Sequence, residues 1–338
     1  MRSLVLLGPG SLALEETGVP EAAPGEVVVR VASCGICGSD VHSYAGRHPF
    51  VIYPVVQGHE FSGTVESVGE GVSEDLLGGR VVVEPSLACG RCRQCLSGRY
   101  NICTGLRVMG FQAPGAMCEY VAVPEERLHP LPDRVSLTEG ALVEPCAVAV
   151  HAFARSGVSP GEAIAVIGAG VIGSMIIKVA KACGCTVLAL ESDEARAQRA
   201  AGMGADAALV SATVSADDVA GAAGGEVAAV FECVGDGRTL ARAIEIAPRG
   251  STVVVVGVFA GPVPVEAALI QDGELDLKGT LMYTGDDFRR AMDLMSDRAL
   301  DVSGFVSRSV PLEGVEEAYR LLLGPASDVM KVIVEPGG

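Results

Sequence analysis

The stretch AIAVIGAGVIGSMIIKVAKACG, residues 163–184, joins a short apolar run to a longer helical pattern through three glycines. The apolar run predicts a β-strand, and residues 170–184 predict a helix. Gly168, Gly170 and Gly173 follow the spacing Gly-x-Gly-x-x-Gly. In this context the first glycine makes a tight turn, the second lets a pyrophosphate approach the backbone, and the third lets helix and strand pack closely. The stretch therefore predicts a dinucleotide-binding turn.

An acidic residue at the end of the next strand is the second requirement of such a site. Glu191 closes TVLALE (186–191), about 20 residues beyond the first glycine, where a carboxylate accepts a hydrogen bond from a ribose 2′-hydroxyl and repels a 2′-phosphate. NAD is therefore favoured over NADP, although Arg196 keeps NADP as an alternative. A glycine-rich turn without a ligand is the competing interpretation, which the strand, glycines, helix and acid in register disfavour. We assign four further residues to the cofactor site: Val171, Ile172, Val234 and Val256.

Strands and short helices continue to alternate after this unit. The order predicts an α/β, doubly wound parallel sheet with helices on its faces. Strands are expected at 163–168, 186–191, 227–235, 250–257 and 275–283, and helices at 170–184, 193–204 and 237–248.

The first half of the chain has a different pattern, made of short Val-rich runs bounded by Gly and Pro. A length of 338 residues suits two domains. Strands are expected at 26–33, 61–69, 79–85 and 118–124, a helix at 137–157, and two helices and a strand in the C-terminal tail.

Composition limits the class of protein. Hydrophobic residues are 49% and charged residues 20%, which indicates a globular chain. The net charge of -17 argues against a nucleic-acid partner; it favours a cationic ligand or only aids solubility. No apolar run reaches the roughly 20 residues of a membrane span, and no export signal is recognisable. We therefore expect a cytoplasmic protein whose eleven cysteines are reduced.

The stretch CGRCRQCLSGRYNIC, residues 89–103, spaces four cysteines as C-x2-C-x2-C-x7-C. Four thiolates in one loop suit a closed, structural zinc site. Iron–sulfur ligation competes, but the seven-residue gap and the missing proline after the last cysteine disfavour it. Four unmetallated buried cysteines are a further alternative that this density disfavours. The predicted ligands are Cys89, Cys92, Cys95 and Cys103.

A second cysteine motif, CGICGSDVH, lies at residues 34–42. By spacing alone, Cys34 and Cys37 are compatible with a joint metal site, a redox disulfide, or one ligand to a site completed elsewhere. GHEFSG (58–63) and VEP (143–145) supply a histidine and carboxylates that suit the third alternative.

Taken in chain order, CGICGSDVH, GHEFSG, the four-cysteine loop, GAGVIG and LKGTLMY resemble zinc-dependent medium-chain alcohol and polyol dehydrogenases over essentially the whole chain. The match is to the sorbitol, threonine and 2-deoxy-scyllo-inosamine dehydrogenase-like branch. The resemblance implies a GroES-like β-rich catalytic domain, residues 1–146 completed by 285–338, and a Rossmann NAD-binding domain, residues 147–284. It also implies two zinc ions per chain and an NAD(P)-dependent zinc alcohol dehydrogenase.

The resemblance assigns the catalytic zinc ligands residue by residue. Cys37, directly before Gly-Ser-Asp, is the first and His59 the second. Glu60 matches a glutamate that ligates directly in polyol members, and Glu144 in VEP ligates or lies one water away. Cys146 is a rival third ligand.

The resemblance also implies a proton relay. Ser39 takes the proton of the substrate hydroxyl, which zinc polarises as a Lewis acid, and His42 passes it towards solvent while hydride goes to the nicotinamide. Asp40 would orient a ligand histidine, or only cap a turn.

The substrate implied is a small polar secondary alcohol of a polyol, sugar or aminocyclitol. Met282, where sorbitol-type members have an arginine, and Ser43, where they have an aromatic residue, argue against sorbitol itself. The missing arginine and the acidic charge are compatible with a cationic aminocyclitol, as in aminoglycoside biosynthesis. The alternatives are a threonine-type or simple alcohol dehydrogenase, and a non-catalytic NAD-binding protein with structural zinc only. A homodimer or homotetramer is expected, joined through the sheet edge formed by 250–257 and 275–283.

Overall fold

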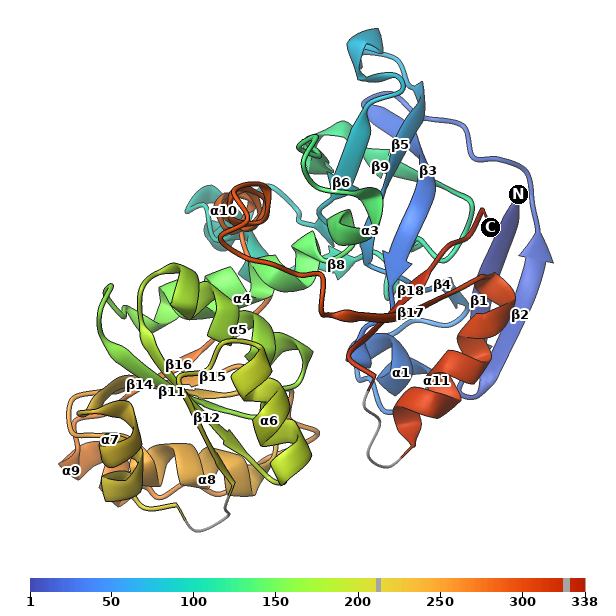
Figure 1. The fold of residues 1–338 in the computed structure, drawn as a ribbon. Coiled ribbons are helices and arrows are strands. Elements are labelled where there is room, and N and C mark those ends of the chain that lie inside the picture. Colours follow the sequence, from blue (N-terminus) through green and yellow to red (C-terminus); the bar gives the residue numbers. More distant parts are fainter. Residues whose placement is uncertain (211–213, 325–328, 338) are drawn as a thin grey trace. The chain divides into compact units, whose positions relative to one another are not determined.

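The computed structural model describes residues 1–210, 214–324 and 329–337 and divides the chain into two units (Figure 1). The first unit comprises Met1–Glu144, Thr284–Ser296 and Val302–Gly338, and the second comprises Pro145–Tyr283 and Asp297–Asp301. The short segment Asp297–Asp301 groups with the second unit, whereas the predicted domain limits placed it in the first. The C-terminal part of the chain thus returns to the N-terminal unit.

A β-sheet whose central strand is β3 (Glu26–Gly35) forms the first unit. Valines at alternate and adjacent positions of β3 are buried, because the strand is covered on both faces. β3 pairs antiparallel with β5 (Glu60–Val68), β9 (Tyr120–Pro124) and the C-terminal strand β18 (Lys331–Val334). The remaining strands of this sheet are β6 (Arg80–Val83), β10 (Leu128–Pro130) and β17 (Val306–Val310).

The four strands predicted in the first half are present as β3, β5, β6 and β9. The sequence analysis missed other strands, among them an N-terminal hairpin that turns at Gly10, which has a φ of 71°. Strands not predicted in this unit are β1 (Arg2–Gly8), β2 (Ser11–Glu16), β4 (Val55–Val56), β7 (Ser86–Leu87), β8 (Arg107–Val108), β10 and β17.

The predicted helix over 137–157 is two helices, α3 (Leu137–Gly140) and α4 (Val143–Ser156). Pro145 has no N–H to donate to residue 141, so a continuous helix is broken and Pro145 lies in the first turn of α4. The other helices of the first unit are α1 (Gly38–Tyr44), α2 (Arg93–Leu96), α10 (Gly285–Ser296) and α11 (Val315–Leu323), with 3-10 turns η1 (Glu74–Leu76), η2 (Tyr100–Ile102), η3 (Glu125–Arg127) and η4 (Leu312–Gly314).

The second unit contains a fully parallel sheet in the order β13-β12-β11-β14-β15-β16, which confirms the predicted α/β Rossmann-type fold. Helices cover both faces, with α4 and α5 on one and α7 and α8 on the other (Figure 1). The strands are β11 (Ala163–Ile167), β12 (Thr186–Glu191), β13 (Ala207–Val210), β14 (Val227–Glu232), β15 (Thr252–Val255) and β16 (Asp276–Gly279). The helices after α4 are α5 (Val171–Ala182), α6 (Glu194–Gly202), α7 (Ala216–Ala223), α8 (Gly237–Ile246) and α9 (Ala267–Asp272).

Two details of this unit differ from the prediction. β13, α7 and α9 were not predicted. The strand expected over 275–283 ends at Gly279, and Met282 has a φ of 48°, a left-handed conformation that an extended strand does not allow. Within the described ranges, no helix combines the length and apolar character required to cross a membrane.

Candidate active site and metal centres

Three predicted metal ligands converge in the first unit. Cys37 caps the N-terminus of α1, and His59 and Glu60 stand at the start of β5. One ligand atom from each, the Cys37 sulfur included, lies within 4.8 Å of the others. His59 is 6% and Glu60 1% exposed, whereas Cys37 is partly exposed, so the group is reached by water only on the Cys37 side. Chain segments more than twenty residues apart thus bring a thiol, an imidazole and a carboxylate together.

Asp40 lies behind this group, as the resemblance implied. It is fully buried, and its Oδ2 accepts a hydrogen bond from the backbone N–H of Cys37 at 2.9 Å. Its Oδ1 lies 3.5 Å from Nδ1 of His59. Burial lowers the pKa of His59, but Asp40 and Cys37 outweigh it and raise that pKa well above its ordinary value. The local field therefore favours positive charge beside Cys37 and His59.

Glu60 is bound by a residue that the sequence analysis missed. Lys331, in β18, donates to both carboxylate oxygens of Glu60 at 2.8 and 2.7 Å and to the carbonyl oxygen of Ile36 at 3.1 Å. These bonds use all three donors of the ammonium group. Burial lowers the pKa of Lys331, but the Glu60 carboxylate outweighs it, so this pKa is raised. A Cβ at Gly35 would collide with the Glu60 carboxylate, so a side chain there would displace this carboxylate from its position against Lys331.

Glu144 lies in the first turn of α4 and is 7% exposed. It is not part of the three-residue group defined by the 4.8 Å limit. Its carboxylate nevertheless raises the pKa of Lys331, after the larger effects of Glu60 and Cys37, which places it in the same electrostatic neighbourhood. Two buried carboxylates therefore compete for the role of third ligand, and Lys331 already holds one of them.

The donor set of this group fits zinc. Thiolate, imidazole and carboxylate are all zinc ligands, and catalytic zinc sites use three protein ligands with one open position. His59 Nδ1 and Asp40 Oδ1 are both buried, and neither atom makes a hydrogen bond. The 3.5 Å contact between these two atoms orients the histidine ring. Cys34, the other half of the CxxC motif, is fully buried and belongs to the apolar core, so it is not a second ligand of this group.

The two predicted relay residues lie on α1. Ser39 is partly exposed and His42 exposed, and a spacing of three places them on one face of the helix. Ser43 is fully buried, and its hydroxyl donates to the carbonyl oxygen of Ser39 at 2.9 Å. Ser43 therefore packs on the buried side of α1 and is closed to water.

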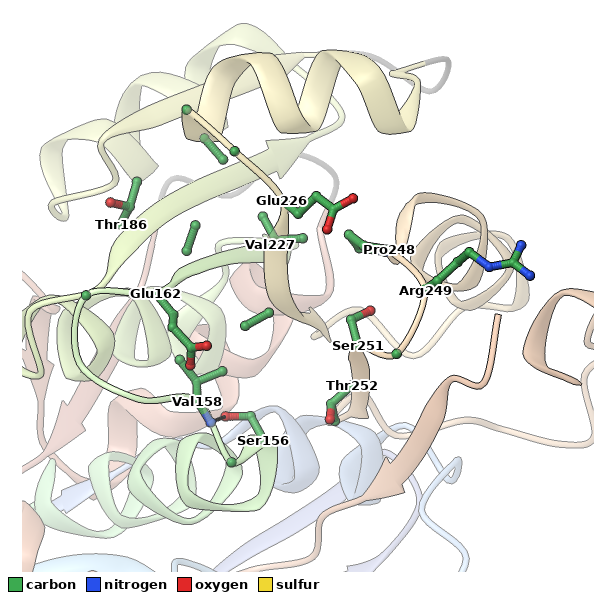
Figure 2. Close-up of a pocket in the computed structure, with 18 residues that line it drawn as sticks. Ser156, Val158, Glu162, Thr186, Glu226, Val227, Pro248, Arg249, Ser251 and Thr252 are labelled. Atoms are coloured by element: carbon green, nitrogen blue, oxygen red, sulfur yellow. Dashed lines mark hydrogen bonds between the residues drawn. The ribbon is translucent and has the colours of Figure 1, made fainter. Parts of the chain in front are cut away.

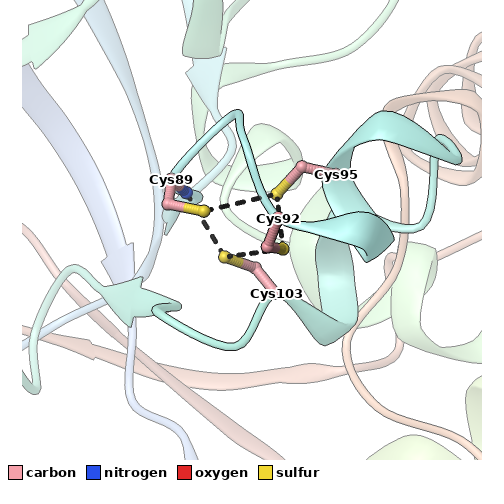
Figure 3. Close-up of side chains that lie close together, drawn as sticks. All are labelled: Cys89, Cys92, Cys95 and Cys103. Carbon is pink, nitrogen blue, oxygen red and sulfur yellow. Dashed lines mark hydrogen bonds between the residues drawn. The ribbon is translucent and has the colours of Figure 1, made fainter.

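The four predicted structural cysteines converge in one loop (Figure 3). The sulfur of Cys92 lies 3.4 Å from that of Cys95 and 3.8 Å from that of Cys103, and the Cys89 and Cys95 sulfurs are 3.9 Å apart. Zinc–sulfur bonds of about 2.3 Å in a tetrahedron give sulfur–sulfur edges of about 3.8 Å, whereas a disulfide bond is about 2.05 Å. All eleven cysteines, each among the described residues, are free thiols. The loop therefore fits a tetrathiolate metal site.

Electrostatics in this loop also favours a cation. Backbone N–H groups of Cys95 and Thr104 lower the pKa of Cys92 to about 5. Desolvation and the neighbouring Cys92 and Cys103 sulfurs raise the pKa of Cys95 to about 12. One thiolate thus suppresses ionisation of the next, and four thiolates require a bound cation.

The glycine turn lies at the carboxyl end of β11. Gly168 has a φ of 88°, a left-handed conformation that favours glycine. A Cβ at Gly173 would collide with the Gly168 carbonyl oxygen, whereas a Cβ at Gly170 would meet no atom within 4 Å. The turn is thus tightly packed on one side and open at Gly170, which leaves space for a pyrophosphate at the N-terminus of α5. Val171 and Ile172 form the partly exposed first turn of that helix.

Glu191 lies beside the turn, at the end of β12. It is 6% exposed and accepts hydrogen bonds from the backbone N–H groups of Ala169 and, at 3.3 Å, Ser192. Its carboxylate therefore holds the glycine turn as well as marking the predicted ribose position. Arg196, in α6, is exposed and pairs with Asp193 at 3.5 Å.

The other predicted cofactor residues follow the next strands of the same sheet edge. Val234, 51% exposed, comes after β14, and Val256 comes after β15. A fully buried residue that the sequence analysis missed connects them. Glu232 Oε1 accepts from Val234 N and Gly235 N at 2.9 Å and from Thr239 Oγ1 at 2.7 Å, and its backbone carbonyl accepts from Val256 N. The only signal in the sequence was an acid ending an apolar strand.

A hollow of about 690 Å³ lies at the other edge of this sheet, where β11, β12, β14 and β15 begin (Figure 2). Its labelled lining includes Glu162, Thr186, Glu226 and Thr252. None of the predicted metal-binding or cofactor-binding residues lines it. The predicted sites are therefore separate from this hollow.

A dinucleotide-binding parallel sheet and a unit with two metal-binding groups define a metal-dependent dehydrogenase class. The alcohol dehydrogenase GroES-like domain matches residues 23–133, and the zinc-binding dehydrogenase family matches residues 171–297. The chain is 31% identical to a sorbitol dehydrogenase of Bacillus subtilis (strain 168) over 99% of this chain and 97% of that protein. It is 36% identical to a 2-dehydro-3-deoxy-L-galactonate 5-dehydrogenase of Pseudoalteromonas atlantica, over 92% of both chains.

A solved structure extends the comparison to the fold. A zinc-binding dehydrogenase of Sinorhizobium meliloti 1021, bound to NADP, has a TM-score of 0.92 and 32% identity over 99% of each chain. The chain therefore belongs to the zinc-dependent medium-chain alcohol and polyol dehydrogenase family, and the predicted family and fold are confirmed. It is an NAD(P)-dependent oxidoreductase, with zinc and a nicotinamide dinucleotide as its cofactors.

The Glu60–Lys331 pair predicts a specific stability change. Lys331→Met leaves the Glu60 carboxylate buried without its cation, so we expect the free energy of unfolding to fall by about 3–5 kcal/mol. The measurement is equilibrium urea unfolding of both proteins in the same metal-free buffer. Lys181→Met is the matched control, because its pair with Asp206 is partly exposed, and it should cost less than about 1 kcal/mol. Equal losses in both variants would contradict the assignment.

The four-cysteine loop predicts a metal count. Cys95→Ser removes one thiolate of the closed site, so bound zinc should fall from about two ions per chain to about one. Elemental analysis of the purified proteins gives the count. Cys183→Ser, which lies outside both groups, should keep about two ions. Retention of two ions by Cys95→Ser would show that the loop does not hold zinc.

Proposed function

We propose that this protein oxidises a secondary alcohol of a polar polyol or sugar derivative to a ketone, with hydride transfer to NAD. The observation that carries the proposal is the convergence of Cys37 and His59, whose ligand atoms lie within 4.8 Å of each other, beside two buried carboxylates, Glu60 and Glu144. A purely structural zinc protein has no need of this second group. The chain's family membership and its glycine turn support the same conclusion.

We propose Cys37, His59 and Glu144 as the protein ligands of the catalytic zinc. Both oxygens of Glu60 are engaged by Lys331, and Glu144, buried in the first turn of α4, occupies the position where the family resemblance expects a ligand. When bound, zinc supplies Lewis-acid polarisation of the substrate hydroxyl, and NAD accepts the hydride. Asp40 holds His59 in one orientation by its contact with Nδ1.

The proton follows the exposed face of α1. Ser39 accepts it from the substrate hydroxyl and releases its own hydroxyl proton towards His42, three residues later on the same face, which passes a proton to solvent. The partial exposure of Ser39 and the exposure of His42 support this direction. Ser43 and Asp40, which lie on the buried side of α1, fix the helix and take no part in the transfer.

NAD is the preferred cofactor in this proposal. Glu191 is fixed by Ala169 N and Ser192 N at the end of β12, so its negative charge disfavours a 2′-phosphate. The pairing of Arg196 with Asp193 supports the same preference, because that guanidinium already has a carboxylate partner. The glycine turn, Val171, Ile172, Val234 and Val256 would contact the dinucleotide.

A cationic aminocyclitol, as in aminoglycoside biosynthesis, is the second candidate substrate. It is favoured by the net charge of -17 and by Met282, which replaces an arginine of sorbitol-type members. A neutral polyol is the first candidate, because the relatives that match nearly the whole chain include a sorbitol dehydrogenase. A cytoplasmic location is part of the proposal, supported by eleven free thiols.

The experiment that tests the function is NADH or NADPH formation by zinc-loaded protein. The panel contains sorbitol, 2,3-butanediol, a sugar acid, L-threonine and an aminocyclitol. We expect activity with NAD and a polyol, and a loss of at least about 10–100-fold in kcat/KM for Glu144→Gln. Glu125→Gln, an equal charge change at a partly exposed position of η3, is the control.

Each result of this panel separates the alternatives. Activity confined to the aminocyclitol would replace the polyol by the second candidate, and activity confined to threonine would replace it by an amino acid. Unchanged activity of Glu144→Gln would remove Glu144 from the ligand set. No turnover with any substrate, by protein containing two zinc ions, would contradict the proposed function.

We also propose a homo-oligomer joined at β16. β15 lies between two strands, whereas β16 pairs only with β15 in the described sheet, so its other edge offers free backbone groups. Leu277 in β16 is 37% exposed and Leu281 52%. The proposed interface therefore uses β16 alone, and not both predicted strands. β15, which lies within the predicted strand over 250–257, is an internal strand of the sheet.

The exposed edge of β16 predicts how a charged side chain there would change the oligomeric state. Leu277→Asp should convert the oligomer to monomers, because a carboxylate at the interface loses its hydration without a partner. Light scattering coupled to size-exclusion chromatography measures the mass. Leu96→Asp, at a residue that is 76% exposed in the other unit, should leave the mass unchanged. An oligomer that survives Leu277→Asp would place the interface elsewhere.

A further inference from the structure

A line of buried polar side chains leads from α11 to the metal-binding group. Tyr319 in α11 is fully buried, Gln57 is 1% exposed, and Asp40 is fully buried. The Tyr319 hydroxyl lies 3.0 Å from Gln57 Oε1, and Gln57 Nε2 donates to the backbone carbonyl oxygen of Asp40 at 3.1 Å. Residues separated by 262 positions in the sequence are thus joined without water.

The direction of these hydrogen bonds is fixed by chemistry. The carbonyl oxygen of Asp40 can only accept, so Gln57 must present its NH2 group to it. The amide oxygen of Gln57 then faces Tyr319, whose hydroxyl must donate. The Met117 sulfur, 3.3 Å from the hydroxyl, is the weaker acceptor. A reversed amide would set two oxygens against each other and is excluded.

The far end of the line touches both proposed ligands. Asp40 Oδ2 accepts from Cys37 N at 2.9 Å, and Asp40 Oδ1 lies 3.5 Å from His59 Nδ1. Gln57 is also two residues before His59 in the chain. A shift of the Gln57 amide group would therefore move the backbone of Asp40. It would also move the short chain segment that joins Gln57 to His59.

We propose that Tyr319 is a positioning residue for the catalytic metal: its hydroxyl fixes the Gln57 amide, which fixes Asp40 and with it Cys37 and His59. The C-terminal helix α11 thereby sets the metal affinity of a site formed by residues 37–59. This inference rests on the metal site of the proposed function. Loss of the hydroxyl leaves the Gln57 oxygen buried without a donor and frees the amide to turn.

The test is cobalt binding to the metal-stripped full chain, followed by absorbance. Co²⁺ bound by Cys37 and His59 gives bands distinct from Co²⁺ bound by four thiolates, so each site is titrated separately against a chelator. Tyr319→Phe should weaken Co²⁺ binding at the Cys37–His59 site by about tenfold, the lower end of effects from residues behind the ligands. Binding at the four-thiolate site should not change, which shows that the variant is folded.

The control deletes the same atom from the neighbouring tyrosine. The Tyr44 ring lies 5.3 Å from that of Tyr319, but its hydroxyl bonds to Glu316 Oε1 at 3.2 Å and not to Gln57. Tyr44→Phe should leave both cobalt affinities unchanged. Gln57→Leu is the second variant and should weaken the same site at least as much as Tyr319→Phe, because it removes both hydrogen bonds.

The outcomes are distinct. Unchanged affinity in Tyr319→Phe and Gln57→Leu, with cobalt bound normally in the unaltered protein, would overturn the inference and leave the proposed function intact. An equal loss in Tyr44→Phe would also overturn it, since general loosening of the α1–α11 interface would explain the result. Failure of the unaltered protein to bind cobalt at Cys37 and His59 would contradict the proposed metal site and this inference together.

Discussion

The buried ion pair between Glu60 and Lys331 ties the beginning of β5 to the C-terminal strand β18. Both side chains are almost fully buried, so each charge requires the other, and the pair stabilises the fold only in this arrangement. Lys331 also holds both oxygens of Glu60, one of the two buried carboxylates near Cys37 and His59. The C-terminal segment that groups with the first unit supplies both Lys331 and Tyr319.

The two metal-binding groups differ in how their ligands meet. Cys89, Cys92, Cys95 and Cys103 lie within fifteen consecutive residues, and their close spacing in the sequence fixes most of their geometry. The group around Cys37 and His59 depends on strand pairing and on buried partners far along the chain. A substitution within the four-cysteine loop is therefore enough to remove that zinc site. The Cys37–His59 site is also sensitive to substitutions at positions far away in the sequence.

Buried acids organise the edge of the parallel sheet in a comparable way. Glu191 is the last residue of β12, and Glu232 is the last residue of β14. Each carboxylate accepts hydrogen bonds from backbone N–H groups of a turn that follows its strand or lies beside it. The turns that carry the predicted cofactor contacts are thus held before a dinucleotide binds. Preformed turns lower the entropic cost of binding, since the backbone has less freedom to lose.

The sequence alone determined the family, the two-part architecture, the glycine turn with Glu191, and the four-cysteine loop, because each depends on residues close together in the chain. Short strands such as β1, β13 and β17 escaped prediction, since their register is set by neighbours and not by their own pattern. Only the tertiary structure decided that Lys331 holds Glu60, that Ser43 faces inward, and that Gln57 and Tyr319 stand behind Asp40. A buried polar residue needs a partner, and where that partner comes from is a property of the folded chain.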